Sequence, residues 1–322
     1  MERDPILAAE GASELREDLM KIGFCLCAFF PLGSVVATFF IDFYSRLSFL
    51  EGKELTEAFM QSPYHPIYML IGSVLPILIC IFLFRLFFKA PFSIKMLSPI
   101  CEKKHFWIYT LAGLIILPLG VLVTSSVSQL FSLFGITFNA TVAPNGGTET
   151  IIFILIHAIC APIFEELLFR GYILERLRRF GDIFAVIASA FLFSMLHASF
   201  QSIPFAFISG VIFGILAVKT GSILSSMIIH GANNIFSVIW ILLSTSSIKS
   251  LDIIFYIILA VFGLISAMAI LFLTKMDPNA FSLTFDSGHI KATRKAALLL
   301  TSFSMLVFYM FSLTLSISSI IG

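Results

Sequence analysis

The most constraining feature of this sequence is a series of apolar runs, each about as long as a membrane is thick. A helix needs about 20 apolar residues to cross the hydrocarbon core, and we find nine such runs in the 322 residues. Only 12% of the residues are charged and 59% are hydrophobic, whereas soluble proteins carry about 25% charged residues. The sequence therefore predicts an all-α, polytopic transmembrane helix bundle. The expected spans are residues 22–44, 67–88, 106–128, 152–174, 183–200, 203–219, 222–244, 252–274 and 297–320.

The charges outside these runs predict an orientation. Residues 1–19 are expected to form a short amphipathic or disordered arm, and nine spans then place the two termini on opposite sides. Seventeen of the 20 Lys and Arg residues fall on the side of the N-terminus, and only Arg46, Lys53 and Lys249 fall on the other. Because Lys and Arg collect on the cytoplasmic side, we expect a cytoplasmic N-terminus and an outside C-terminus, in the cytoplasmic membrane of a bacterium.

Two adjacent carboxylates, Glu165 and Glu166, lie inside the fourth apolar run. Ionisable groups within a membrane span are costly, so by default they mark a functional site. Arg170 follows Glu166 by four residues and shares its helix face, which favours an ion pair. Glu165 is rotated by about 100° from Glu166, so it points elsewhere and stays free for chemistry. Taken alone, these residues are explained equally well by an ion pair that anchors the helix end.

Three further polar residues lie in later runs. His197 ends the fifth run, and His230 and Asn234 lie four residues apart on one face of the seventh. Each of them, taken alone, is explained by hydrogen bonding between packed helices. In the sixth run, Gly210 and Gly214 form a small-xxx-small face, which predicts close contact with another helix.

The estimated depths of the carboxylates and histidines agree. Glu165 is eleven residues from Arg176, which corresponds to a depth of about 16 Å at 1.5 Å per residue. On the same rise, His230 lies about 12–15 Å deep and His197 about 21 Å deep. We therefore expect Glu165 or Glu166, with His197 and His230, to line one water-accessible cavity in the inner half or middle of the bilayer.

These residues form three motifs that follow one another in successive spans. They are Glu165-Glu166-x-x-x-Arg170, Phe193-x-x-x-His197 and His230-x-x-x-Asn234. In order and spacing the set resembles the motifs of the CPBP intramembrane proteases, the family of CAAX prenyl endopeptidases and bacteriocin-processing or self-immunity proteins, also called the abortive-infection family. The resemblance covers residues 106–245, which we take as a catalytic helix bundle. Residues 1–105, with an arm and two extra spans, and residues 246–322, with two more, lie outside it.

The resemblance implies an intramembrane endopeptidase whose site opens towards the cytoplasm. Its substrate would be a membrane-associated or prenylated protein or peptide, and we expect no nucleic-acid partner. Glu165 would act as general base on a water molecule that His197 helps to hold. His230 and Asn234 would donate hydrogen bonds to the oxyanion of the tetrahedral intermediate. Glu166 and Arg170 would brace the helix.

A metal is the open question at this stage, because the family is also described as metalloproteases. Glu165, His197 and His230 would then bind Zn²⁺, with water in the fourth position. The sequence contains no His-Glu-x-x-His run, so spacing alone does not identify a metal site. We favour the metal-free carboxylate mechanism.

Two other classes of function fit parts of the same pattern. One is a non-catalytic membrane scaffold or self-immunity protein that keeps the family fold. The other is a proton-coupled transporter in which Glu165, His197 and His230 form a proton relay. Transporters are often built from repeated halves, and no internal repeat is visible in this chain. The complete set of motif residues favours an enzyme over a scaffold.

Reporter fusions at Lys291 and Gly322 test the expected topology. The last span separates these positions, so a reporter that is active on only one side of the membrane should give opposite signals. Equal signals at both positions would show that the last run does not cross the membrane and that the number of spans is not odd.

Overall fold

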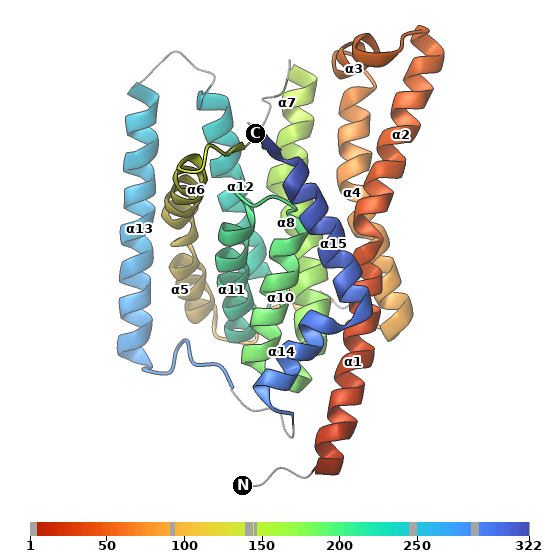
Figure 1. Ribbon diagram of the computed structural model, residues 1–322. Coiled ribbons are helices and arrows are strands. Elements are labelled where there is room, and N and C mark those ends of the chain that lie inside the picture. Colours follow the sequence, from red (N-terminus) through yellow and green to blue (C-terminus); the bar gives the residue numbers. More distant parts are fainter. Residues whose placement is uncertain are drawn as a thin grey trace.

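The computed structural model describes residues 5–90, 94–138, 144, 147–244, 250–284 and 290–321. These residues form a single bundle of helices, which agrees with the predicted all-α class. The first helix begins at one end of the bundle and the chain ends at the other (Figure 1). Two strands of two residues each, β1 (Thr137–Phe138) and β2 (Ile320–Ile321), pair in antiparallel fashion at that second end.

The N-terminal third of the chain forms helices of very different length. The elements are α1 (Pro5–Cys27), α2 (Phe29–Ser48), α3 (Gly52–Met60), α4 (His65–Phe88) and the 3-10 turn η1 (Ile94–Leu97). Together α1 and α2 make a nearly continuous apolar helix of 43 residues. Such a helix is about 64 Å long, about twice the thickness of a hydrocarbon core. Part of it therefore extends beyond the membrane.

The middle of the chain supplies the helices that carry the predicted motifs. It begins with α5 (Lys103–Gly113) and α6 (Ile116–Ser132). A continuous helix follows, formed by α7 (Gly147–Ile154), η2 (Leu155–Cys160), α8 (Ala161–Glu166), η3 (Leu167–Leu174), α9 (Glu175–Leu177) and η4 (Arg178–Phe180). We call this helix, which spans residues 147–180, the glutamate helix. The segment closes with α10 (Asp182–Leu196), α11 (Ile203–Thr220) and α12 (Leu224–Ser244).

The C-terminal part adds α13 (Ser250–Met276), α14 (Ala292–Thr301) and α15 (Phe303–Ser318). Among the described residues, seven helices are long and apolar enough to cross a membrane. Two of the nine expected spans take another form: α10 has only 15 residues, and α14 and α15 are bent by 63° at Ser302. Each expected span overlaps a helix, so the predicted order of helices is confirmed although two of them are short or broken.

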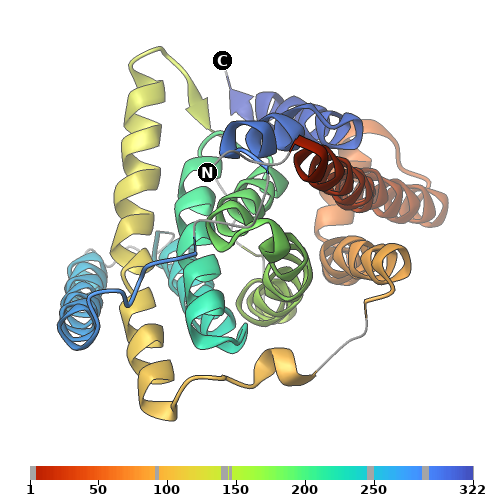
Figure 2. The same ribbon diagram turned by 90° about the horizontal axis from the view of Figure 1, so that it is seen from below.

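The glutamate helix lies near the centre of the bundle beside α10, α11 and α12 (Figure 2). On one side, α13 packs against α5 and α6. On the other, α1 packs against α15 and α4, and α4 contacts the glutamate helix at α8 and η3. The two flanking segments that we defined from the sequence, residues 1–105 and 246–322, are therefore not separate in space. Gly23 lets α1 approach α15 closely, because a Cβ at this position would clash with the Ser304 hydroxyl.

The expected N-terminal arm is instead a packed part of the bundle, because a buried charge cluster fixes it to the glutamate helix. Asp18 in α1 is 2% exposed. Its carboxylate accepts two hydrogen bonds from Arg176, at 2.9 and 3.0 Å, and one from Arg179, at 2.7 Å. Bidentate pairs between arginine and carboxylate are among the strongest charge-assisted hydrogen bonds. The cluster holds the end of the glutamate helix against α1.

The small-xxx-small face predicted for the sixth run is confirmed in α11. A Cβ at Gly210 would lie 3.0 Å from the Cα of Ala190, and a Cβ at Gly214 would lie 3.0 Å from Val186. These two glycines therefore let α10 and α11 approach closely, as small residues do in membrane helix pairs. The same approach brings the backbone of Gly210 within reach of the glutamate helix.

A substitution at Gly210 should reveal how much stability this contact contributes. Gly210→Ala forces α10 and α11 apart, because the new methyl group meets backbone atoms, and overpacking of this kind costs about 1–3 kcal/mol. Gly33→Ala is the matched control, since no atom lies within 4 Å of a Cβ at that helical position. We expect a lower melting temperature in detergent for Gly210→Ala and no loss for Gly33→Ala. Equal melting temperatures would contradict the close contact.

Candidate active site

The glutamate helix changes its winding on both sides of the two carboxylates. Glu165 and Glu166 end the short α-helical segment α8, and the π-helical stretches η2 and η3 flank it. π-helical turns are rare and are frequent at functional sites. Their wider winding disturbs the regular ladder of backbone hydrogen bonds. Some backbone carbonyl groups of this helix must therefore find partners on neighbouring helices.

Glu166 is completely buried and holds two other motif residues. Its Oε1 atom accepts a hydrogen bond from Nη1 of Arg170 at 2.9 Å, and it lies 3.0 Å from Nδ1 of His230. The side chains of Glu166 and Arg170 are both 0% exposed. The ion pair predicted from the four-residue spacing is therefore confirmed. Its position in the interior makes it a joint between the glutamate helix and α12 as well as a brace along one helix.

The buried side chain of Arg170 contacts residues of both α10 and α11. Its Nη2 atom donates to the carbonyl oxygen of Gly210 at 2.9 Å. Its guanidinium carbon lies 4.5 Å from the ring centre of Phe193 and 5.2 Å from that of Phe213. Cation–π contacts stabilise a cation most when water is excluded. Arg170 therefore connects the glutamate helix to both α10 and α11, and removing Glu166 would leave its charge buried and unpaired, at a cost of about 3–5 kcal/mol.

The ring of His230 is fixed by the same groups. It stacks on Phe213, with ring centres 5.0 Å apart, and lies edge-on to Phe193 at 5.7 Å. With Glu166 beside Nδ1, the neutral ring carries its hydrogen on that nitrogen and donates it to the carboxylate. The other nitrogen, Nε2, then faces Glu165 and lies 3.7 Å from its Oε2 atom.

Glu165 differs from Glu166 in exposure and in ion pairing, as the rotation of about 100° between them predicted. Its side chain is 20% exposed, and no arginine or lysine pairs with it among the described residues. It lines a cavity of about 300 Å³ between the glutamate helix and the flanking helices α2 and α4. Cys160 and His157 line the same cavity. Glu165 is therefore the carboxylate that remains available for chemistry.

His197 follows the last residue of α10 and faces a second, larger cavity. Its Nδ1 donates to the carbonyl oxygen of Phe193 at 3.0 Å when the ring carries its hydrogen there. That bond leaves Nε2 as an acceptor, and the side chain is accessible. The next residue, Ala198, has a left-handed backbone with φ of 45°. A residue other than glycine adopts this conformation at a cost of about 1–2 kcal/mol, and such strain collects at functional sites.

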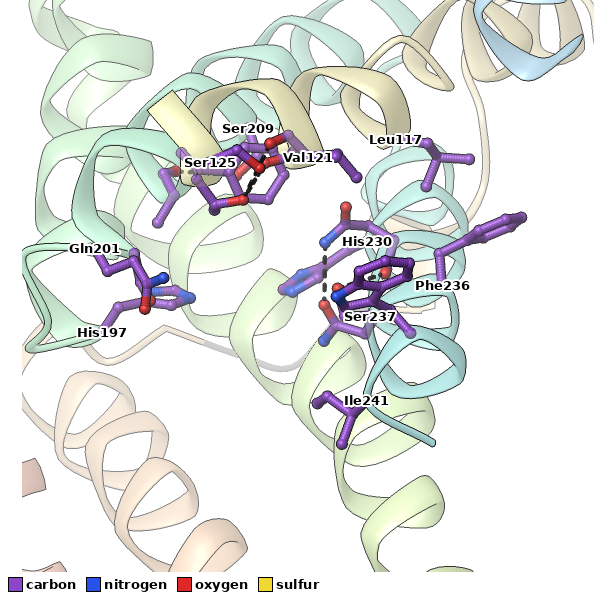
Figure 3. A pocket seen from close by; sticks show the side chains of 18 of the residues that line it. Leu117, Val121, Ser125, His197, Gln201, Ser209, His230, Phe236, Ser237 and Ile241 are labelled. Atoms are coloured by element: carbon purple, nitrogen blue, oxygen red, sulfur yellow. Dashed lines mark hydrogen bonds between the residues drawn. The ribbon is translucent and has the colours of Figure 1, made fainter. Parts of the chain in front are cut away.

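The larger cavity has a volume of about 700 Å³ and is lined by both histidines (Figure 3). His197 and Gln201 lie together on one wall, and His230 and Ser237 come from α12 on another. Asn234 also lines this cavity, whereas Glu165 lines the smaller one. The expectation of one shared cavity is thus correct for the two histidines and wrong for Glu165. His230 lies between the two cavities, because its Nε2 faces Glu165 and its ring lines the larger space.

The direction in which the larger cavity extends also departs from expectation. Its lining continues along α12 from His230 to Trp240 and Ile241, close to the end of that helix at Ser244. This end of α12 lies on the same side of the bundle as β2 (Figure 1). If the N-terminus is cytoplasmic, the cavity occupies the outer half of the membrane. With that orientation the cavity would lie away from the cytoplasm, whereas we expected the site to open towards it.

Asn234 has a structural bond that the sequence did not reveal. The amide of Ala161 donates to the carbonyl of Ile156, five residues earlier. The next residue, Pro162, has no amide hydrogen, so the next carbonyl, that of His157, lacks its backbone donor. The Asn234 side chain supplies one, with Nδ2 donating to the His157 oxygen at 2.8 Å. The proposed oxyanion donor is thus engaged with the glutamate helix in this structure.

The residues suggested as zinc ligands do not converge. Among the described residues, no group of three or more His, Cys, Asp or Glu side chains is arranged to hold a metal ion. Both histidines keep Nε2 available while Nδ1 has a partner, which is how metal-bound histidines are usually oriented. Glu165, however, lies in the neighbouring cavity. The donor set does not fit a metal in this arrangement, so we derive no step of the reaction through one.

Comparison with known proteins identifies the segment that carries the site. Residues 147–236 match the family described as "Type II CAAX prenyl endopeptidase Rce1-like". The matched segment runs from the start of α7 to just beyond Asn234, so it contains all the candidate residues. The match supports the CPBP family for this segment.

A curated relative supports the same family. It is described as the membrane-embedded CAAX protease MroQ of Staphylococcus aureus (strain USA300), and it is 35% identical over 105 residues. These residues make up 30% of this chain and 42% of the relative, so the chain matches less than half of that protein's length. No solved structure matches the chain. Within residues 147–236, the chain is therefore similar to membrane-embedded CAAX proteases.

The role of Asn234 can be separated from that of its bond to His157. Pro162→Ala restores an amide hydrogen for the His157 carbonyl. We expect Asn234→Ala to lower stability by about 0.6 kcal/mol in the natural background and by less in the Pro162→Ala background. If Asn234 also donates to an oxyanion, its loss should reduce turnover by about 10²–10³ in both backgrounds.

Melting temperatures in detergent and cleavage rates, measured on the four combinations of these two substitutions, test this expectation. Asn233→Ala is the control, because the Asn233 amide reaches only the side-chain oxygen of Asn234, at 3.4 Å. If Pro162→Ala restores the cleavage rate of Asn234→Ala, Asn234 has only the structural role.

Proposed function

We propose that this protein is an intramembrane endopeptidase that hydrolyses a peptide bond in a membrane-associated or prenylated protein or peptide. The membership of residues 147–236 in a protease family supports the class of reaction. One observation carries the proposal for this chain. A buried Glu166–Arg170 pair fixes His230 so that its Nε2 faces Glu165, a carboxylate without an Arg or Lys partner among the described residues, at 3.7 Å.

In the proposed reaction, Glu165 activates water. A separation of 3.7 Å between Oε2 of Glu165 and Nε2 of His230 is too long for a direct hydrogen bond. The two atoms are close enough to act on the same water and the same carbonyl group. The carboxylate of Glu165 takes a proton from the water as its oxygen attacks the carbonyl carbon, and later gives a proton to the leaving amine.

His230 stabilises the charge that forms on the carbonyl oxygen. When Nε2 carries a hydrogen, it donates that hydrogen to the oxyanion. Arg170 keeps Glu166 in place, and the rings of Phe193 and Phe213 keep His230 from rotating. These residues position the donor before the reaction begins.

The two carboxylates should respond differently to the same substitution. Glu165→Gln removes the general base but no ion pair, so we expect turnover to fall by about 10²–10⁴ with an unchanged melting temperature. Glu166→Gln leaves Arg170 buried without its counter-ion, so we expect loss of both stability and activity. The exposed Glu54→Gln is the control, because it changes a carboxylate far along the chain in α3.

Mass spectrometry of membrane-associated peptides from cells that express each variant measures the turnover, and unfolding in detergent measures the stability. A Glu165→Gln protein that still generates the wild-type products would refute the role of Glu165 as base. A chelator that stops cleavage, with recovery on addition of zinc, would replace the carboxylate mechanism by a metal-dependent one.

A further inference from the structure

The larger cavity contains no formal charge apart from what its histidines can carry. Of the described residues that line it, none is Asp, Glu, Lys or Arg. Its polar groups are hydroxyls and amides, including Ser125, Ser209, Ser237 and Gln201. In Figure 3, Ser125 and Ser209 lie close together, Gln201 lies beside His197, and Ser237 lies near His230. A substrate in this cavity therefore meets neutral donors and acceptors around the candidate catalytic histidines.

The nearest buried cation cannot compensate a charge on the substrate. Arg170 lies behind Phe193 and Phe213, which themselves line the cavity. Its Nη1 and Nη2 atoms already donate to Glu166 and to the Gly210 carbonyl. On the other side of His230, the unpaired carboxylate of Glu165 would repel a second negative charge.

Such a lining suits the peptide backbone and excludes charged groups. Neutral hydroxyls and amides both donate and accept hydrogen bonds, so they can pair with backbone N–H and C=O groups of an extended peptide. A charged side chain within a membrane span needs a partner or water, and without one it is costly. A buried charge whose partner is absent is likewise strongly unfavourable.

We infer that this site cleaves an uncharged, internal segment of a membrane-inserted peptide, with no charged residue and no free chain end close to the bond. The inference rests on the proposed function and narrows its substrate. A C-terminal C-a-a-X sequence carries a free carboxylate only a few residues after its cysteine. At about 3.3–3.6 Å per extended residue, that carboxylate would lie about 10 Å from the bond, and none of the described residues that line the cavity is a Lys or Arg.

Matched peptides test the inference on the purified full-length protein in liposomes. The parent is an internal segment of a Glu165-dependent product found by mass spectrometry of membrane peptides. In quenched fluorescent copies, Asn is compared with Asp, and Met with Lys, at each position within three residues of the bond. A third pair ends three residues after the bond, either as a free carboxylate or as an amide. We expect each charged form to be cleaved at least about 10-fold more slowly, from the cost of an unpaired charge in a membrane.

A charge placed in the cavity should reverse one of these preferences. Ser237 lies on α12 seven residues after His230, hence on the same helix face. Ser237→Lys should raise the Asp-to-Asn ratio of cleavage rates at least about 10-fold relative to Ser237→Met, which has a similar length without the charge. Because the ratio is taken within each variant, a general loss of activity does not affect it.

The outcomes separate this inference from the proposed function. If no membrane peptide depends on Glu165, the proposed function fails, and the inference fails with it. If Glu165-dependent products exist but their bonds are flanked by charged residues or by a free C-terminus, the protease is real and the inference is wrong. Equal rates for the Asn and Asp peptides would also overturn it.

Discussion

The buried pair of Glu166 and Arg170 is the interaction on which the other parts of the site depend. Through it, one atom of the glutamate helix receives hydrogen bonds from two directions, along its own helix and from His230 on α12. Arg170 extends the connection to the Gly210 carbonyl and to two aromatic rings. In a membrane, where helices gain little from hydrophobic association, such a junction fixes the relative rotation of four helices. The position of Glu165 follows from that of Glu166, because Glu165 immediately precedes it on the same helix.

The class of the fold and the order of the helices could be predicted because they follow from hydrophobic length, and length is visible in a sequence. The errors occurred where packing overrides length. The expected arm packs into the bundle, because Asp18 pairs with Arg176 and Arg179, residues more than 150 positions away. The break at Ser302 separates α14 from α15 in what reads as one apolar run. Neither the ion pairs of Asp18 nor the break at Ser302 leaves a local signal in the sequence, since both depend on which distant segment lies alongside.

For the site, spacing predicted pairs within a helix correctly but not the arrangement between helices. Glu166 and Arg170 pair as four-residue spacing requires, and Glu165 points away. The distribution of His230 and Glu165 over two cavities could not be predicted, because it depends on the π-helical winding on both sides of α8. Pro162 was the one available signal, since a proline inside a helix removes a backbone donor. Combined with Asn234, it accounts for a bond that we had not anticipated.

The arginines at the end of the glutamate helix also affect how such a protein is assembled. Asp18 lies in α1, whereas Lys295, whose amine donates to the Phe180 carbonyl, lies in α14, which is synthesised after every motif residue. Both hold the same end of the glutamate helix, so its final position is set only after α14 has been synthesised. A nascent chain that already contains every motif residue then still lacks the contact that α14 supplies. Under the proposed function, this order of assembly would keep the site inactive among the unfolded membrane proteins that surround it at the translocon.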